Sequence, residues 1–189
     1  MRYTYNTYWQ KRINETLMTA LDAHPRVLML RVDLRTPNNQ NSIDSAVISR
    51  FIDSLKAKIH ACQQRKIKEG KRFHSTSLRY IWAREFGNAN GRKHYHLVLL
   101  LNRDTWCSAG SFQSNTSLAG LIKQAWCSAL HVNFDSYSTL AHFPTNPALW
   151  IDRENWYQIE QGLNRANYLA KDYTKIIGDG ERNFGCSQN

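Results

Sequence analysis

Hydrophobic residues recur at helical spacing in four stretches of the chain. In the first, Ile13, Leu17 and Leu21 repeat every four positions, and the pattern stops at His24–Pro25. A helix is expected to end there, because the residue before a proline disfavours the helical conformation. Similar apolar stripes mark the other three stretches. The predicted helices cover residues 8–23, 43–62 with a basic extension to 70, 116–130 and 155–176.

Shorter apolar runs between these helices have the composition of strands. Residues 27–34 and 94–101 are largely aliphatic, and residues 78–87 are rich in aromatic and aliphatic strand formers. The segment 88–93 contains asparagine and glycine, which predicts a hairpin loop between the last two runs. A further short strand is expected near 140–143.

This order of elements predicts an α+β fold in which helices flank an antiparallel sheet of four or five strands. Residues 1–178 contain no internal repeat, low-complexity linker or plausible boundary, so we expect one domain. Residues 179–189 are mostly polar, and we expect them to form a loose tail.

Two histidines open the strand predicted at 94–101. His94 and His96 are separated by one residue, and alternate side chains of a strand point to the same face. Two imidazoles that converge from one strand can share a metal ion. Two histidines at the rim of a core strand would produce the same pattern, so the spacing alone leaves both interpretations open.

The predicted hairpin supplies a third metal ligand. If Gly87 pairs with His94 across the loop, Glu85 lies opposite His96, and cross-strand partners share a face. A register shift by one residue would turn Glu85 to the other face, so this assignment depends on the register. Asp33, in the first strand, is the fallback for the third position.

The last predicted helix carries a candidate nucleophile. Tyr168, Lys171 and Lys175 are spaced three and four residues apart, which places them on one face of a helix. A phenol is a weak nucleophile near neutral pH and needs a base, a cation or a metal to assist it. A lysine beside it can stabilise negative charge on a phosphate under attack. Tyr173 lies on a different helical face and is the weaker candidate, and Lys175 is a weaker candidate than Lys171.

Composition adds a preference for polyanionic partners. The formal net charge is +10, which makes nucleic acid the first partner to consider. The basic residues are concentrated in the middle of the chain rather than in a terminal tail. Two groups of basic residues are expected to bind DNA phosphates. The first group is Arg65, Lys66, Lys68, Lys71 and Arg72, and the second, beside the histidines, is Arg92 and Lys93.

Cysteine usage and hydropathy indicate the compartment. The four cysteines are scattered and form no Cys-x-x-Cys pair, which argues against a disulfide framework or a structural zinc site. The first residues contain no apolar leader, and no run approaches the length of a membrane span. We therefore expect a soluble cytoplasmic protein with reduced thiols and no membrane partner.

Taken together, the motifs resemble those of the HUH endonucleases of rolling-circle replication. The order is a His-x-His strand after a strand that bears a glutamate, and then a downstream Tyr-x-x-Lys motif. More narrowly, the chain resembles the replication initiators of filamentous phages and related proteins of cryptic prophages and satellite elements. The stretches that carry this resemblance are Arg31-Val32-Asp33-Leu34, Arg84-Glu85-Phe86-Gly87, Arg92-Lys93-His94-Tyr95-His96 and Tyr168-Leu169-Ala170-Lys171.

The resemblance implies a metal-dependent, site-specific endonuclease and strand transferase that acts on single-stranded or origin DNA. His94, His96 and Glu85 would hold Mg²⁺ or Mn²⁺, and Tyr168 would form a covalent link to the 5′ end. Tyr95 stands where the family more usually has a bulky hydrophobic residue. The two-tyrosine initiators commonly place their tyrosines four residues apart, whereas Tyr168 and Tyr173 are five apart.

The remaining expectations concern partners and alternatives. The chain has no Gly-x-x-x-x-Gly-Lys-[Ser/Thr] loop, so a host helicase and a host polymerase would have to serve the replicon. One alternative is a non-catalytic regulator that binds DNA or protein on the same fold. Another is RNA binding through a sheet face that bears Tyr80, Trp82 and Tyr95.

Overall fold

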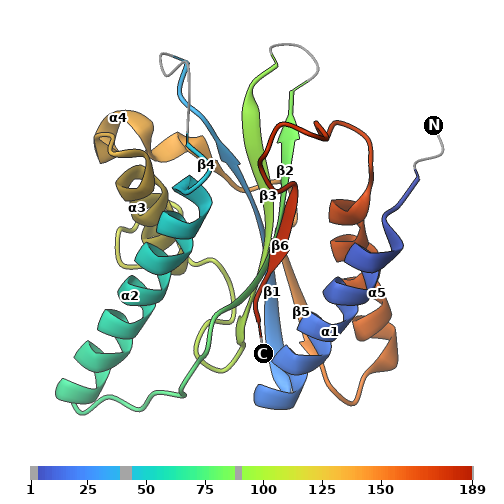
Figure 1. The fold of residues 1–189 in the computed structure, drawn as a ribbon. Coiled ribbons are helices and arrows are strands. Elements are labelled where there is room, and N and C mark those ends of the chain that lie inside the picture. Colours follow the sequence, from blue (N-terminus) through green and yellow to red (C-terminus); the bar gives the residue numbers. More distant parts are fainter. Residues whose placement is uncertain (1–3, 39–43, 88–90, 189) are drawn as a thin grey trace.

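The structure, a computed structural model, describes residues 4–38, 44–87 and 91–188 (Figure 1). The predicted helix start at 43 and part of the predicted hairpin loop, residues 88–90, lie outside these ranges. The helices are α1 (Thr7–Ala23), α2 (Val47–Lys68), α3 (Leu118–Leu130), α4 (Phe134–Tyr137) and α5 (Trp156–Asn167), with 3₁₀ turns η1 (Ser138–Leu140) and η2 (Tyr168–Ala170). The strands are β1 (Arg26–Arg35), β2 (Arg79–Phe86), β3 (Lys93–Asn102), β4 (Ala141–His142), β5 (Ala148–Asp152) and β6 (Phe184–Cys186).

These strands form one sheet in the order β4-β1-β3-β2-β6, and β5 pairs with the other end of β1. All of the strand pairs are antiparallel. Helices α2, α3 and α4 cover one face of the sheet, and α1 and α5 cover the other (Figure 1). The α+β class with an antiparallel sheet is therefore confirmed. Over the described residues the sheet has six strands rather than four or five, because β5 and β6 join it.

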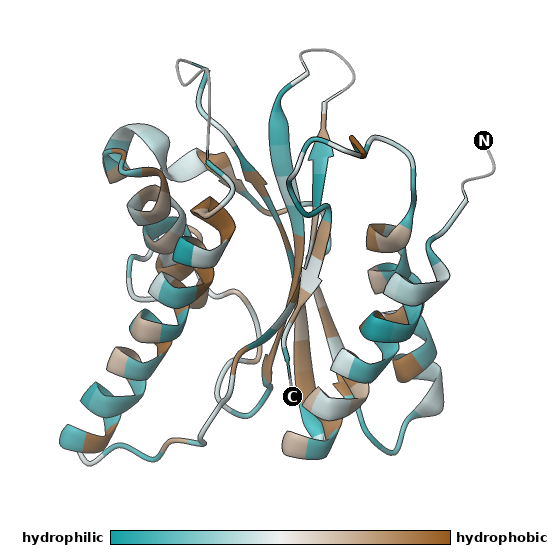
Figure 2. Cartoon of the chain, in the orientation of Figure 1, coloured by the Kyte–Doolittle hydropathy of each residue, from teal (hydrophilic) through white to brown (hydrophobic). Residues whose placement is uncertain are grey.

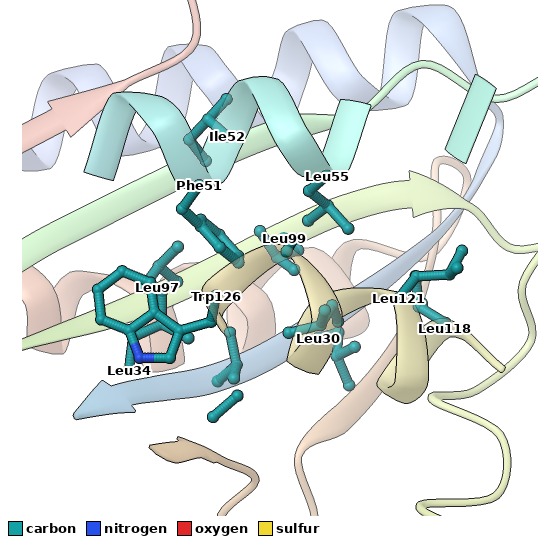
Figure 3. Packing of buried hydrophobic residues seen from close by; sticks show 14 of the residues in the cluster. Leu30, Leu34, Phe51, Ile52, Leu55, Leu97, Leu99, Leu118, Leu121 and Trp126 are labelled. Carbon is teal, nitrogen blue, oxygen red and sulfur yellow. The ribbon is translucent and has the colours of Figure 1, made fainter. Parts of the chain in front are cut away.

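Alternation along β3 divides the core into two layers. Tyr95, Leu97 and Leu99 point toward α2 and α3, where Phe51 and Trp126 meet edge to face at 5.8 Å (Figure 3). The opposite face of β3 contributes apolar residues to a second cluster with α1 and α5. Apolar residues lie along the middle of the strands, whereas the strand ends near the top of the view are hydrophilic (Figure 2). The candidate chemistry lies at those hydrophilic ends.

The helix predicted over 155–176 is too long. Helix α5 ends at Asn167, one 3₁₀ turn follows, and Lys171 has extended backbone angles. The chain leaves the helix because Lys171 forms a bridge with Tyr5, and the amide of Asp172 donates to the carbonyl of Thr4. This pairing with the N-terminal segment overrides the local helical pattern. The prediction that Tyr168, Lys171 and Lys175 lie on one helical face is wrong.

The C-terminal residues expected to be a loose tail are largely attached to the sheet. Strand β6 pairs with β2, and Cys186 lies opposite Ile81. The buried guanidinium of Arg84 makes an ion pair of 2.8 Å with Asp179. At Gly185 an added Cβ would lie 2.5 Å from the ring of Trp82, so this approach of β6 requires glycine. Among the described residues, no helix is long and apolar enough to cross a membrane.

Candidate active site

The hairpin of β2 and β3 places a glutamate beside the two histidines. Glu85 is the cross-strand partner of His94, and Ala83 is the partner of His96. The predicted register, with Glu85 opposite His96, is therefore wrong by two residues, because Gly87 pairs with Arg92 rather than with His94. A shift by two residues keeps every side chain on its face. Glu85 Oε2 still lies 3.5 Å from His96 Nε2.

Both imidazoles are held through Nδ1. His94 Nδ1 lies 3.2 Å from the carbonyl oxygen of Arg92, and His96 Nδ1 lies 2.5 Å from Asp33 Oδ1. A carbonyl and an ionised carboxylate can only accept, so each Nδ1 is the donor. Nε2 is then the ring nitrogen that could bind a metal. The two rings meet edge to face with centroids 4.9 Å apart. Asp33, the fallback metal ligand, instead orients His96, an arrangement common around metal-binding histidines.

Glu85 is the buried centre of the cluster, with 2% of the residue exposed. Thr174 Oγ1 donates to its Oε2 at 2.7 Å. Lys171 Nζ and Lys175 Nζ lie 3.3 and 3.2 Å from its carboxylate oxygens. Burial by itself raises the pKa of Glu85, but the hydrogen bonds from His96 and Thr174 and the nearby positive charges lower it well below its usual range. The carboxylate is therefore ionised.

The donor set fits a divalent cation. One ligand atom each from Glu85, His94 and His96 lies within 4.8 Å of the other two. Burial lowers the pKa of His94, which favours the neutral form that binds metals. Burial also acts to lower the pKa of His96, but its contacts with Asp33 and Glu85 raise it, so an ion has to displace a proton there. Two imidazoles with one carboxylate suit Mn²⁺ better than Mg²⁺, which prefers oxygen ligands.

The histidines open into a cavity of about 500 Å³ at the hydrophilic end of the sheet. Arg92 lies at this cavity, and its side chain donates to Asn38. Thr36, also on the cavity wall, donates to the carbonyl of Lys93 at 2.8 Å. The cavity makes the candidate metal site accessible to a ligand from solvent.

The candidate nucleophile joins this cluster. Lys171 Nζ donates to the hydroxyl oxygen of Tyr168 at 2.6 Å, and the same nitrogen is the one paired with Glu85. Burial acts to lower the pKa of Lys171, but the contacts with Tyr168 and Glu85 raise it. Lys171 therefore stays charged beside the phenol. Burial lowers the pKa of Lys175, whose side chain is 2% exposed.

Tyr173, the weaker candidate nucleophile, lies on the irregular segment that follows η2. The residue is 44% exposed, and its carbonyl oxygen lies beside the Thr174 hydroxyl. Thr174 has a positive φ of 69°, an uncommon conformation for a β-branched residue. This backbone turn directs the Thr174 hydroxyl to Glu85.

The predicted DNA-binding residues separate in space. Lys93 borders the same cavity as the histidines. Its side chain alternates to the opposite face of the sheet, where both oxygens of Glu181 lie 2.8 Å from its Nζ. The first basic group, at the C-terminal end of α2, lies at the far end of the sheet (Figure 1). Lys66 there lies 5.3 Å from the ring centre of Trp106, which follows the end of β3 remote from His94. A role for this group in DNA binding stays a prediction, on a surface separate from the candidate site.

The aromatic face proposed for RNA binding belongs to the core. Trp82 and Tyr95 are 5% and 1% exposed, and their rings meet edge to face at 5.9 Å. Tyr95 also contacts Trp126 at 6.2 Å between ring centres. Tyr80 is partly buried and packs against the same cluster. The expected exposed face of three aromatic rings is therefore not formed, because Trp82 and Tyr95 face the helical layer rather than solvent.

Three residues at the site were missed from the sequence. Arg31 Nη2 lies 3.3 Å from His96 Nδ1, and its guanidinium lies 5.3 Å from the ring centre of Tyr168. His142 Nδ1 lies 3.9 Å from Asp33 Oδ2. Arg31 could have been found, because it precedes Asp33 by two residues and so shares its face of the strand. Thr174 and His142 reach the site through pairings distant in sequence, for which the local pattern carried no signal.

The fold and the site define an α+β protein that carries a His–His–Glu cluster on one face of an antiparallel sheet. The chain belongs to the YagK/YfjJ C-terminal domain family, whose model matches residues 2–187. It is 38% identical over 192 residues to the uncharacterized protein YagK of Escherichia coli strain K12. The aligned region covers 95% of this chain and 92% of YagK. It is 39% identical over 197 residues to the uncharacterized protein YfjJ of the same strain. That aligned region covers 95% of this chain and 93% of YfjJ. No solved structure matches the chain.

Proposed function

We propose that this protein is an HUH-type, metal-dependent endonuclease and strand transferase for single-stranded DNA. In this proposal it forms a 5′-phosphotyrosine intermediate and initiates rolling-circle-type replication of a phage or mobile element. The observation that carries the proposal is an unbroken series of contacts from the hydroxyl of Tyr168 through Lys171 and Glu85 to His96. The candidate nucleophile and the candidate metal ligands therefore belong to one cluster.

The metal ligands in this proposal are His94, His96 and Glu85. A bound Mg²⁺ or Mn²⁺ would act as a Lewis acid on the scissile phosphate. Asp33 holds His96 with Nε2 directed at the ligand position, and the carbonyl of Arg92 does the same for His94.

Tyr168 is the nucleophile in this proposal. Its phenolic oxygen bonds to phosphorus, the bond from phosphorus to the 3′ oxygen breaks, and the phenolic proton ends on the leaving 3′ hydroxyl. Lys171 donates to the phenolic oxygen and supplies positive charge beside the phosphate under attack. The free 3′ hydroxyl would then serve a host polymerase as primer, and a host helicase would unwind the duplex.

Positive charge around the site suits a phosphodiester. Arg31 and Lys175 lie within the cluster, and Arg92 borders the cavity in front of the histidines. These positive side chains would stabilise the extra negative charge that develops on the phosphoryl group during attack. DNA binding that depends on them should weaken steeply with salt.

One observation favours the alternative of a non-catalytic DNA- or protein-binding regulator. Lys171 and Lys175 both form ion pairs with Glu85. Ion-pair networks of this kind also occur in proteins at positions that have no catalytic role. On this alternative the protein would bind its partner with equal affinity in the presence and absence of Mn²⁺.

An adduct assay tests the proposal. The protein is incubated with Mn²⁺ and a random-sequence pool of single-stranded oligonucleotides labelled at the 3′ end, because the fragment joined to tyrosine retains that end. The proposal predicts a labelled protein band that survives denaturation in wild type and Tyr173→Phe and is absent in Tyr168→Phe. Absence of the band in wild type, or its persistence in Tyr168→Phe, would contradict the proposal.

A further inference from the structure

A second cavity lies directly behind the candidate nucleophile. Its volume is about 310 Å³, at the lower end of the range for small-molecule sites. It is enclosed by the face of β1 and β3, by the loop from Pro144 to Pro147 and by the C-terminal end of α5. The sheet strands β1 and β3 and the end of α5 contribute Met29, Arg31, Val98, Asn164, Arg165 and Tyr168 to its lining.

This cavity adjoins the metal-ligand cluster through two shared residues. The aromatic ring of Tyr168 lines the cavity, and its hydroxyl contacts Lys171 in the cluster. Arg31 also belongs to both, because it lines the cavity and lies 3.3 Å from His96 Nδ1. A ligand in the cavity would therefore lie next to a phosphate presented to the Tyr168 hydroxyl.

The lining combines an apolar floor with a polar, cationic rim. Met29 and Val98, both 2% exposed, project from the sheet as the floor. The rim carries the amide of Asn164 and the guanidinium groups of Arg31 and Arg165, and the described lining includes no acidic residue. This lining matches the chemistry of a nucleotide. The apolar floor suits the face of a base, the amide can donate to and accept from the edge of the base, and the positive charge suits a phosphate.

The loop over the cavity is held in a defined shape. Asn146 has a left-handed backbone, with φ of 53°, and its carbonyl accepts from Arg165 Nη1 at 3.3 Å. The carbonyl of Pro147 accepts from the amide of Arg31 at 2.8 Å. The loop is thus fastened to both α5 and β1, so the cavity exists before any ligand arrives.

We propose that this cavity binds the base of the nucleotide adjacent to the scissile phosphate, with Arg31 beside that phosphate. The inference rests on the proposed function, since it assigns the cavity to the DNA strand that Tyr168 attacks. It adds a site where a single base, rather than the phosphate backbone alone, contributes to binding. Base contact of this kind orients the strand and so positions the phosphate.

The test compares two 12-nucleotide probes in chelator, where no cleavage occurs. One probe is oligothymidylate, and the other has the same sugar–phosphate backbone with abasic positions throughout. Because stacking of one base contributes about 1–3 kcal/mol, wild type should bind the thymidylate probe about tenfold more tightly than the abasic probe. Fluorescence anisotropy measures both affinities.

Two variants assign any preference to this cavity. Asn164 is exposed on α5, so Asn164→Trp blocks the cavity without disturbing the core and should abolish the preference for thymidylate. Arg165→Ala should weaken binding of the thymidylate probe. Arg153→Ala is the matched control, because Arg153 is 43% exposed and lies outside the cavity, and it should keep the wild-type preference.

The outcomes separate this inference from the proposed function. Equal binding of the two probes by wild type, or an undiminished preference in Asn164→Trp, would overturn the cavity assignment even if a Tyr168 adduct forms. A preference that disappears in Asn164→Trp but not in Arg153→Ala would support the cavity assignment, even if no adduct is ever detected and the catalytic proposal fails.

Discussion

Lys171 Nζ donates a hydrogen bond of 2.6 Å to the hydroxyl oxygen of Tyr168, and the same nitrogen lies 3.3 Å from Glu85. The pair joins a phenol to a buried carboxylate through one ammonium group. Because the ammonium is charged, it supplies positive charge beside the oxygen that attacks the phosphate in the proposed reaction. This relationship sets the first prediction.

Lys171→Met should slow adduct formation by about a hundredfold, because it removes the donor to the attacking oxygen. Single-turnover rates at saturating DNA measure the effect. Lys175→Met is the matched control, because it removes a second cation from Glu85 but leaves the bond to Tyr168 in place. Equal losses in the two variants would mean that charge on Glu85, and not the contact with Tyr168, is what matters.

Mn²⁺ should bind wild type with one-to-one stoichiometry in a calorimetric titration. His94→Ala and His96→Ala should each reduce the affinity at least tenfold, since each removes one of three protein ligands. His74→Ala provides the control, because His74 is exposed and lies outside the cluster. If both ligand variants bind the ion as wild type does, the assigned metal site is wrong.

The affinity for Mn²⁺ should fall as the pH falls. Burial acts to lower the pKa of His96, but its contacts with Asp33 and Glu85 raise it. An ion can bind Nε2 only after that proton leaves, so affinity is greatest above the raised pKa and declines below it. Asp33→Asn should lower the pKa of His96 and move this decline to lower pH. A pH profile that is the same in wild type and Asp33→Asn would contradict the assigned contact.

The C-terminal strand should contribute to global stability. Gly185→Ala places a methyl group against the ring of Trp82 and should lower the free energy of unfolding by about 1–3 kcal/mol. Gln188→Ala, an exposed change two residues beyond β6, should have almost no effect. Equal stability of both variants in urea unfolding would show that β6 does not pack as described.

The sequence predicted the parts of the site that depend on local geometry. His94 and His96 share a face because a strand alternates with period two, whatever surrounds it. Glu85 joined them despite a register error of two residues, since an even shift preserves the face. The same argument would have failed for a shift of one residue.

The parts that depend on distant pairing were not predictable. Lys171 reaches Tyr168 and Glu85 because its backbone bridges Tyr5, a contact between the two ends of the chain that no local spacing records. The helical pattern correctly predicted that Lys171 lies beside Tyr168. The contact does not arise from a continuous helix, because Lys171 has extended backbone angles. In the same way, β6 joins the sheet by pairing with β2 beside Trp82, and Arg84 holds the preceding Asn183, although β6 itself is only three residues long.

The most direct test of the central claim is the identity of the residue that carries DNA. The denaturant-resistant adduct formed with Mn²⁺ is trimmed with nuclease, and the modified peptide is sequenced by mass spectrometry. The account predicts a nucleotide joined through its 5′ phosphate to Tyr168. A nucleotide on Tyr173 or any other residue, or no modified peptide at all, would contradict it.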